Sequence, residues 1–181
     1  MPRDKELVSS KDMQHASSTK GGFRTGEIYE AFDRTYGAVQ AMFVKTVGAV
    51  GVQGSPMYPK TGSFTVAADF LCDDDEDGSG VVGEENCLGS WISGVTTAAG
   101  YGFVQIYGFN LVALTTDGTV AAKSTVLPTT TDGTWEGVLS NTLMTAGTNN
   151  PATRAGFANT ADVSTASAVG TVFWDVHQPG C

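Results

Sequence analysis

Side chains that could carry out chemistry are scarce in this sequence. Only 16% of its 181 residues are charged, and its two histidines, His15 and His177, lie near its two ends. It contains no H-E-x-x-H metal motif, no phosphate-binding P-loop and no G-x-S-x-G nucleophile elbow. A pair of carboxylates suited to glycoside cleavage stays open, because the fold sets the spacing of such a pair. We therefore expect a protein that is not an enzyme.

Positive charge and long apolar runs are also in short supply. Ten Lys and Arg face 19 Asp and Glu, a net charge of −9. Binding to nucleic acid needs clustered cations, so we expect no nucleic-acid partner. No apolar run approaches the roughly 18–20 residues that cross a bilayer, so we expect no membrane association. The N-terminus has no apolar stretch of the secretory type, which predicts synthesis in the cytoplasm.

Three cysteines are too few for a disulfide framework. Cys72 and Cys87 are a candidate disulfide, because their sulfurs would be neighbours if the strands beside them paired. The cytoplasm would keep both thiols reduced, whereas a particle released outside the cell would allow oxidation. Cys181, the last residue, is expected to link at most to another chain.

Glycine and threonine are abundant instead, with 23 of each. Short apolar segments alternate with Gly, Pro and Asp, and Asp117-Gly118 and Asp132-Gly133 are typical hairpin turns. A short helical turn is an alternative around Glu27–Asp33. The sequence predicts an all-β fold, a sandwich or a barrel, with an extended N-terminal arm. The expected strands are Val39–Val44, Gly48–Val52, Ser63–Phe70, Gly89–Val95, Gly102–Tyr107, Leu111–Thr115, Thr119–Ala121, Thr134–Val138, Thr153–Ala158 and Val169–Val176.

The segment from Tyr101 to Gly108 gives the clearest strand pattern. One face would carry the large side chains of Tyr101, Phe103, Gln105 and Tyr107, and the other face mostly small ones. The large face is expected to fill the core, or else to form an interface between copies of the chain. The small face would let another layer of the structure approach closely. Trp174, in the last strand, belongs to the same core-or-interface set.

An acidic segment, Asp73–Glu84, fits the pattern of a calcium loop of the EF-hand type. Asp73, Asp75, Asp77 and Glu84 would supply the oxygens. The neighbouring segments are predicted strands rather than the helices of an EF-hand. The loop is therefore interpreted as a solvated acidic hairpin, with a weak calcium site of another type as the alternative. We expect no other cofactor.

The charge divides the chain into an arm and a body. Residues 1–25 carry a net charge of +2 and residues 26–181 a net charge of −11. We expect residues 1–35 to be an N-terminal arm, extended or partly disordered alone, and 36–181 to be a β-rich domain with the acidic loop 72–87. The arm would lie on a neighbouring copy or another acidic surface, or else be solvated. Its expected contact residues are Arg3, Lys5, Lys11, Lys20, Phe23 and Arg24.

Three tryptophans, Trp91, Trp135 and Trp174, are candidates for a sugar-stacking platform. The simpler interpretation of each is a core or rim residue of a strand.

An ordered series of segments resembles the bacteriophage capsid decoration proteins, also called cement or head-stabilising proteins. Its most specific part is the run Tyr-Gly-Phe-Val-Gln-Ile-Tyr-Gly at residues 101–108, after Thr97-Ala-Ala-Gly100. The acidic segment and the arm lie outside the resemblance. The other matching segments are Gln40–Lys45, Val52–Tyr58, Gly89–Val95, Asp117–Ala122, Ala155–Ala158 and Val169–Val176.

The resemblance implies a single β-barrel or β-tulip-like sandwich domain. It also implies a structural virion protein on the outer surface of a phage head. Such a protein would form homotrimers and clamp adjacent subunits of the major capsid protein. The alternative is a receptor- or carbohydrate-binding virion module, such as a head fibre base or a tail adhesin.

Overall fold

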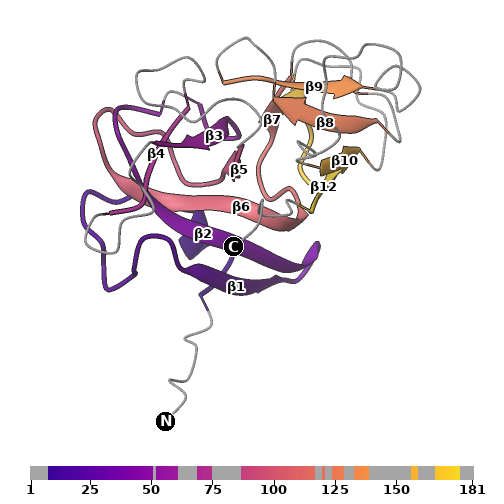
Figure 1. The fold of residues 1–181 in the computed structure, drawn as a ribbon. Coiled ribbons are helices and arrows are strands. Elements are labelled where there is room, and N and C mark those ends of the chain that lie inside the picture. Colours follow the sequence, from indigo (N-terminus) through magenta and orange to yellow (C-terminus); the bar gives the residue numbers. More distant parts are fainter. Residues whose placement is uncertain are drawn as a thin grey trace.

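The computed structural model describes residues 8–50, 52–60, 69–74, 87–116, 120, 124–128, 133–138, 156–158 and 166–175. Nearly all of the regular structure in these residues is strand (Figure 1), which confirms the predicted all-β fold. A single turn of 3-10 helix, η1 (Asp12–Gln14), is the one helical element described. The strands are β1 (Ile28–Asp33), β2 (Gly37–Thr46), β3 (Pro56–Pro59), β4 (Leu71–Asp73), β5 (Gly89–Trp91), β6 (Tyr101–Phe109), β7 (Leu114–Thr115), β8 (Thr125–Pro128), β9 (Trp135–Val138), β10 (Gly156–Ala158), β11 (Ala166–Ser167) and β12 (Val172–Asp175).

Five strands close into a ring. They follow one another in the order β2-β4-β3-β5-β6, and β2 pairs in turn with β6. The β2–β4 pairing is parallel and the other four are antiparallel. Each of the five strands contributes to one apolar cluster, which therefore fills the inside of the ring. This barrel core consists of Met42, Val44, Val50, Met57, Cys72, Leu88, Trp91 and Val104.

The same sheet continues beyond the ring into a second part of the molecule. From β6 it runs through β12, β10 and β8 to β9, and Figure 1 shows these strands beside the ring. Trp135 and Trp174 are fully buried there, with ring centroids 4.8 Å apart. The structure thus places Trp174 in a core. This second core consists of Leu114, Val120, Val126, Trp135, Val172 and Trp174.

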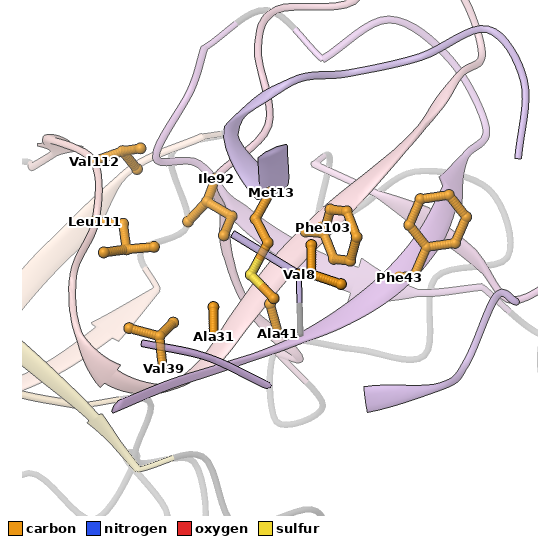
Figure 2. Close-up of a cluster of buried hydrophobic side chains, with 10 residues drawn as sticks. All are labelled: Val8, Met13, Ala31, Val39, Ala41, Phe43, Ile92, Phe103, Leu111 and Val112. Atoms are coloured by element: carbon orange, nitrogen blue, oxygen red, sulfur yellow. The ribbon is translucent and has the colours of Figure 1, made fainter. Parts of the chain in front are cut away.

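The N-terminal residues pack on the outside of the barrel. Val8 and Met13 are buried there, and Met13 reaches from η1 toward Ala31 and Ala41 (Figure 2). The Ser17 and Tyr101 backbones exchange two hydrogen bonds, of 2.9 and 2.7 Å. We call residues 8–27 the strap. The apolar cluster beneath it, the outer core, consists of Val8, Met13, Ala31, Val39, Ala41, Phe43, Ile92, Phe103, Leu111 and Val112.

Two predictions about this region need correction. Residues 28–33 form strand β1 rather than a helical turn, because they pair along their whole length with β2. The expected boundary between residues 35 and 36 falls in the turn that joins β1 to β2. Residues 8–35, expected to form an arm separate from the body, therefore include a strand of the main sheet and part of its core.

Several strands differ from the prediction. Of the described residues in Gly48–Val52, which exclude residue 51, only Val50 forms a β-bridge, with Thr96, so the expected strand is wrong for these residues. β3 and β8 were not expected, because prolines bound β3 and end β8. A proline is tolerated at a strand end, where its missing N–H is not needed by the ladder. Most of the expected strands at 63–70 and 119–121, and the Asp117-Gly118 turn, lie outside the described residues. Gly133, with φ of 72°, lies in the connection between β8 and β9, and Asp132 lies outside the described residues.

Candidate interaction surface

Strand β6 turns its side chains as predicted until a β-bulge interrupts it. Gln105 lies opposite Ala41, but Tyr107 lies opposite the next residue, Gln40, so Ile106 is the extra residue of the bulge. Paired residues share a face of the sheet. Tyr107 therefore leaves the face of Tyr101, Phe103 and Gln105 and joins that of Gln40. It is 38% exposed, whereas Phe103 and Gln105 are buried.

Tyr107 belongs to an aromatic surface that extends over neighbouring strands. Its ring packs edge-on against Phe173 of β12, with centroids 5.3 Å apart, and Phe173 packs in the same way against Phe109. Two strands away, β1 exposes Phe32 (72%) and Ile28 (41%). The register places Phe32 opposite Ala38, which is also exposed. We call Ile28, Phe32, Tyr107, Phe109 and Phe173 the aromatic face.

Acidic and polar groups lie among these apolar side chains. Gln40 donates a 3.1 Å hydrogen bond to Glu30, which is exposed between Ile28 and Phe32. At the end of β1, burial disfavours ionisation of Asp33, but its hydrogen bonds from the Thr35 and Tyr36 amides and the Ser10 hydroxyl outweigh this and lower its pKa. Glu30 thus gives the aromatic face a negative charge, whereas Asp33 points to the opposite side of β1, toward Ser10 of the strap.

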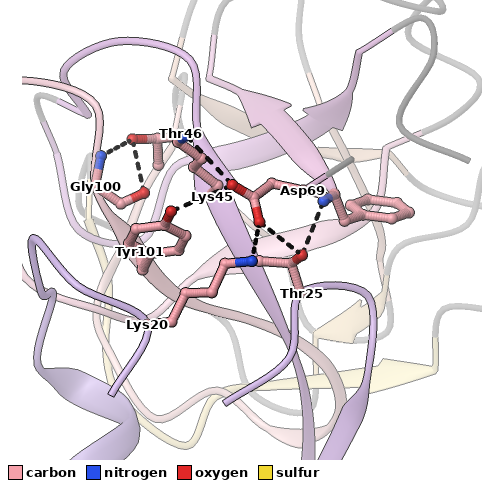
Figure 3. Close-up of polar contacts among 8 residues, drawn as sticks. Lys20, Thr25, Lys45, Thr46, Asp69, Gly100 and Tyr101 are labelled. Carbon is pink, nitrogen blue, oxygen red and sulfur yellow. Dashed lines mark hydrogen bonds and ion pairs between the residues drawn. The ribbon is translucent and has the colours of Figure 1, made fainter. Parts of the chain in front are cut away.

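A second polar cluster holds the strap to the barrel. Asp69 pairs with Lys20 of the strap and, at 3.3 Å, with Lys45 of β2 (Figure 3). It also accepts a 3.2 Å hydrogen bond from the Tyr101 hydroxyl and one from Thr25. The hydrogen bond from Lys20 is the main reason that the pKa of Asp69 is lowered. Nothing in the sequence marks out Asp69, which is the single acid among residues 61–72.

Three of the six residues expected to reach a neighbour have partners within the chain. Phe23 packs against Tyr29, Phe43 and Phe103, with ring centroids 5.1–5.2 Å away. Arg24 lies 3.7 Å from Glu27 on the surface, and Lys20 is paired as above. Lys11 is exposed, and Arg3 and Lys5 lie outside the described residues.

The calcium prediction falls mostly outside the described part of the chain. Asp75, Asp77 and Glu84 are not described. Asp73, at the end of β4, lies 2.9 Å from the Lys60 ammonium group, with both side chains largely buried. Of the four expected ligands, the described one therefore already has a cationic partner. Calcium binding stays a prediction.

Cys72 and Cys87 are free thiols in the structure. The candidate disulfide assumed that the strands beside them pair with each other, but both β4 and β5 pair with β3 instead. Strand β3 thus lies between β4, which carries Cys72, and β5, which Cys87 precedes, so the strand pairing assumed for the disulfide is not formed. Burial raises the pKa of both thiols, that of Cys87 to about 12. They are therefore protonated and unreactive at neutral pH.

The remaining candidates for chemistry are dispersed. Trp91, Trp135 and Trp174 are all fully buried, so none offers a ring face to a sugar. His15 is exposed on the strap, and His177 lies outside the described residues. Within the ranges that the structure describes, no three His, Cys, Asp or Glu side chains gather in a way that could hold a metal ion.

The chain matches no protein-family model, and no curated protein or solved structure is similar to it. Among the described residues there is no helix long and apolar enough to cross a membrane.

Proposed function

We propose that this chain is a structural protein of a bacteriophage virion. It binds the outer surface of the head and stabilises the capsid by clamping adjacent subunits of the major capsid protein. It acts without a cofactor and without enzymatic activity. The resemblance of residues 36–176 to decoration proteins supports this proposal.

The aromatic face is the structural observation on which the proposal depends. The described residues bury three apolar clusters, yet Phe32 stays 72% exposed on the same face of the sheet as Ile28 and Tyr107. Large apolar side chains exposed together on one face are typical of a surface that another protein covers. A protein that clamps others needs such a surface and no reactive groups.

The self-association that we propose is a homotrimer at local threefold axes of the head. Many copies on one shell would multiply modest contacts, as multivalent binding does. The carbohydrate-binding alternative is not favoured, because the three tryptophans that suggested it are buried.

Electron microscopy of phage heads mixed with the purified full-length chain tests the proposal. The heads come from a phage that carries this gene and has lost the protein from its surface. We expect added density on the outer surface at local threefold axes, and heads that resist heating better. Bare heads at saturating protein concentration would disprove the proposal.

A further inference from the structure

Strand β1 leaves one edge of the sheet open. It stands at the end of the strand order and, among the described strands, pairs only with β2. The Phe43 amide donates to the Glu27 carbonyl at 3.0 Å, which fixes the phase of the β1–β2 ladder. Tyr29, Ala31 and Asp33 therefore direct their backbone N–H and C=O groups toward β2. Ile28, Glu30 and Phe32, which alternate with them, direct theirs outward.

The same three residues also present their side chains to solvent. Ile28 and Phe32 are 41% and 72% exposed, and Glu30 lies between them. An open edge with exposed apolar residues invites pairing with another chain. The edge thus offers backbone hydrogen bonds, two apolar contacts and one central negative charge.

Charge argues against a second copy of this chain as the occupant. Two copies could join their β1 edges about a twofold axis, with the aromatic face on the same side in both. The two β1 strands would then run antiparallel, and the even-numbered residues of one would lie opposite the even-numbered residues of the other. The register that matches Ile28 with Phe32 then places Glu30 opposite Glu30. Like charges directly opposite each other destabilise a strand pair. The net charge of −9 adds repulsion at long range.

A positively charged strand has the complementary chemistry. We infer that the open edge of β1 binds an extended segment of the major capsid protein that pairs antiparallel with it. A Lys or Arg of that segment lies opposite Glu30, and apolar residues two positions to either side pack on Ile28 and Phe32. This is recognition by strand addition, in which backbone hydrogen bonds give affinity and alternate side chains give specificity. The identity of the partner depends on the proposed function, whereas the chemistry of the edge does not.

A synthetic peptide tests the edge by itself. The probe is a fluorescent peptide, Thr-Val-Thr-Lys-Thr-Val-Thr, and its matched control carries Glu in place of Lys. Anisotropy titration with the full-length chain should show binding of the Lys peptide alone. Phe32→Ser should weaken it at least roughly tenfold, as loss of a central apolar contact does. Val95→Ser is the control, because Val95 is 59% exposed away from β1 and should not matter.

A charge reversal makes the prediction sharper. The chain with Glu30→Lys should no longer bind the Lys peptide and should bind the Glu peptide instead. Circular dichroism confirms that the variants fold, as expected for substitutions of exposed residues. The inference is overturned if the Lys peptide does not bind. It is also overturned if the affinity for the Lys peptide is unchanged in both Phe32→Ser and Glu30→Lys. Sedimentation that shows a dimer lost in Phe32→Ser would also overturn it, in favour of a second copy.

The same variants on phage heads separate the two proposals. If the wild-type chain decorates heads and Phe32→Ser does not, both stand. If Phe32→Ser decorates heads as well as wild type, the capsid contact lies elsewhere and the inference fails, while the proposed function stands. If wild type binds the Lys peptide but no heads, the edge stands and the proposed function fails.

Discussion

Gly102 is the residue where β6 and the segment after β5 come closest together. A Cβ placed on Gly102 would lie 2.4 Å from Trp91 and 2.5 Å from the Ser93 hydroxyl. Both neighbours are fully buried and cannot move aside. This explains why the small face of the Tyr101–Gly108 strand allows another layer to approach.

Substituting Gly102→Ala should therefore destabilise the protein by about 2–3 kcal/mol, since overpacked cores lose free energy of this size. Gly48→Ala is the matched control, because a Cβ there meets nothing within 4 Å. Urea unfolding monitored by circular dichroism measures both. Equal midpoints for the two variants would contradict the packing of β6 described above.

Asp69 joins the strap to the barrel by charge, and its pKa is lowered chiefly by the hydrogen bond from Lys20. Because the pKa of Asp69 is lowered, its ionised form stabilises the folded state at pH values above the usual pKa of 3.8. This stabilisation is lost as the pH falls through the lowered pKa. Asp69→Asn should cost about 1 kcal/mol at pH 7, as expected for a partly buried pair.

The pH dependence is the distinguishing measurement for Asp69. The difference in unfolding free energy between wild type and Asp69→Asn should shrink between pH 5 and pH 2, roughly the range over which such a carboxylate is protonated. A difference that stayed constant over this range would show that the carboxylate contributes no charge interaction.

At the scale of the element, the strap is part of the body's core. Met13 has no exposed surface and packs among the outer core, and the Ser93 hydroxyl donates a 2.8 Å hydrogen bond to its carbonyl. Removing residues 1–25 would uncover Phe43 and Phe103. We therefore expect this truncation to destabilise the body as well as to affect binding to phage heads.

A single substitution tests the strap without truncation. Met13→Ala should lower the free energy of unfolding by about 2–4 kcal/mol, the range for truncating a buried methionine. Lys11→Ala, at an exposed position of the same turn, should have little effect. If thermal unfolding gave the same midpoint for Met13→Ala and wild type, the strap would not be packed as described.

The strands also show which features of the fold could be predicted from the sequence and which could not. The core strand β6 was predictable, because its large and small residues alternate. The bulge at Ile106 was not, because it depends on the register with β2. Strand β1 was expected to belong to the extended arm, with a helical turn as the alternative, because its pairing with β2 is a tertiary contact. The aromatic face was missed for both reasons.

At the scale of the whole molecule, three apolar clusters share one continuous sheet. The tryptophans lie in two of these clusters, Trp91 in the barrel and Trp135 and Trp174 in the second core. β6 links the two parts, because it closes the ring with β2 and pairs with β12 on the other side.

Burial of all three tryptophans predicts a blue-shifted emission that acrylamide quenches poorly in the native state. Denaturation should shift the emission to longer wavelengths and make quenching efficient. Added sugars should leave the native spectrum unchanged, because no tryptophan presents a ring face. Efficient quenching before unfolding would contradict the buried positions.

The sequence by itself determined the all-β class, most of the long strands and the shortage of reactive groups. These follow from local composition: glycine and aspartate set turns, and alternating side chains set strands. Only the tertiary structure decided what the N-terminal residues do, which strands flank the cysteines and which face Tyr107 occupies. These depend on contacts between residues far apart in the chain, such as Lys20 with Asp69 and Gln40 with Tyr107. Local preference does not encode such pairings, because their free energy appears only when the ring has closed.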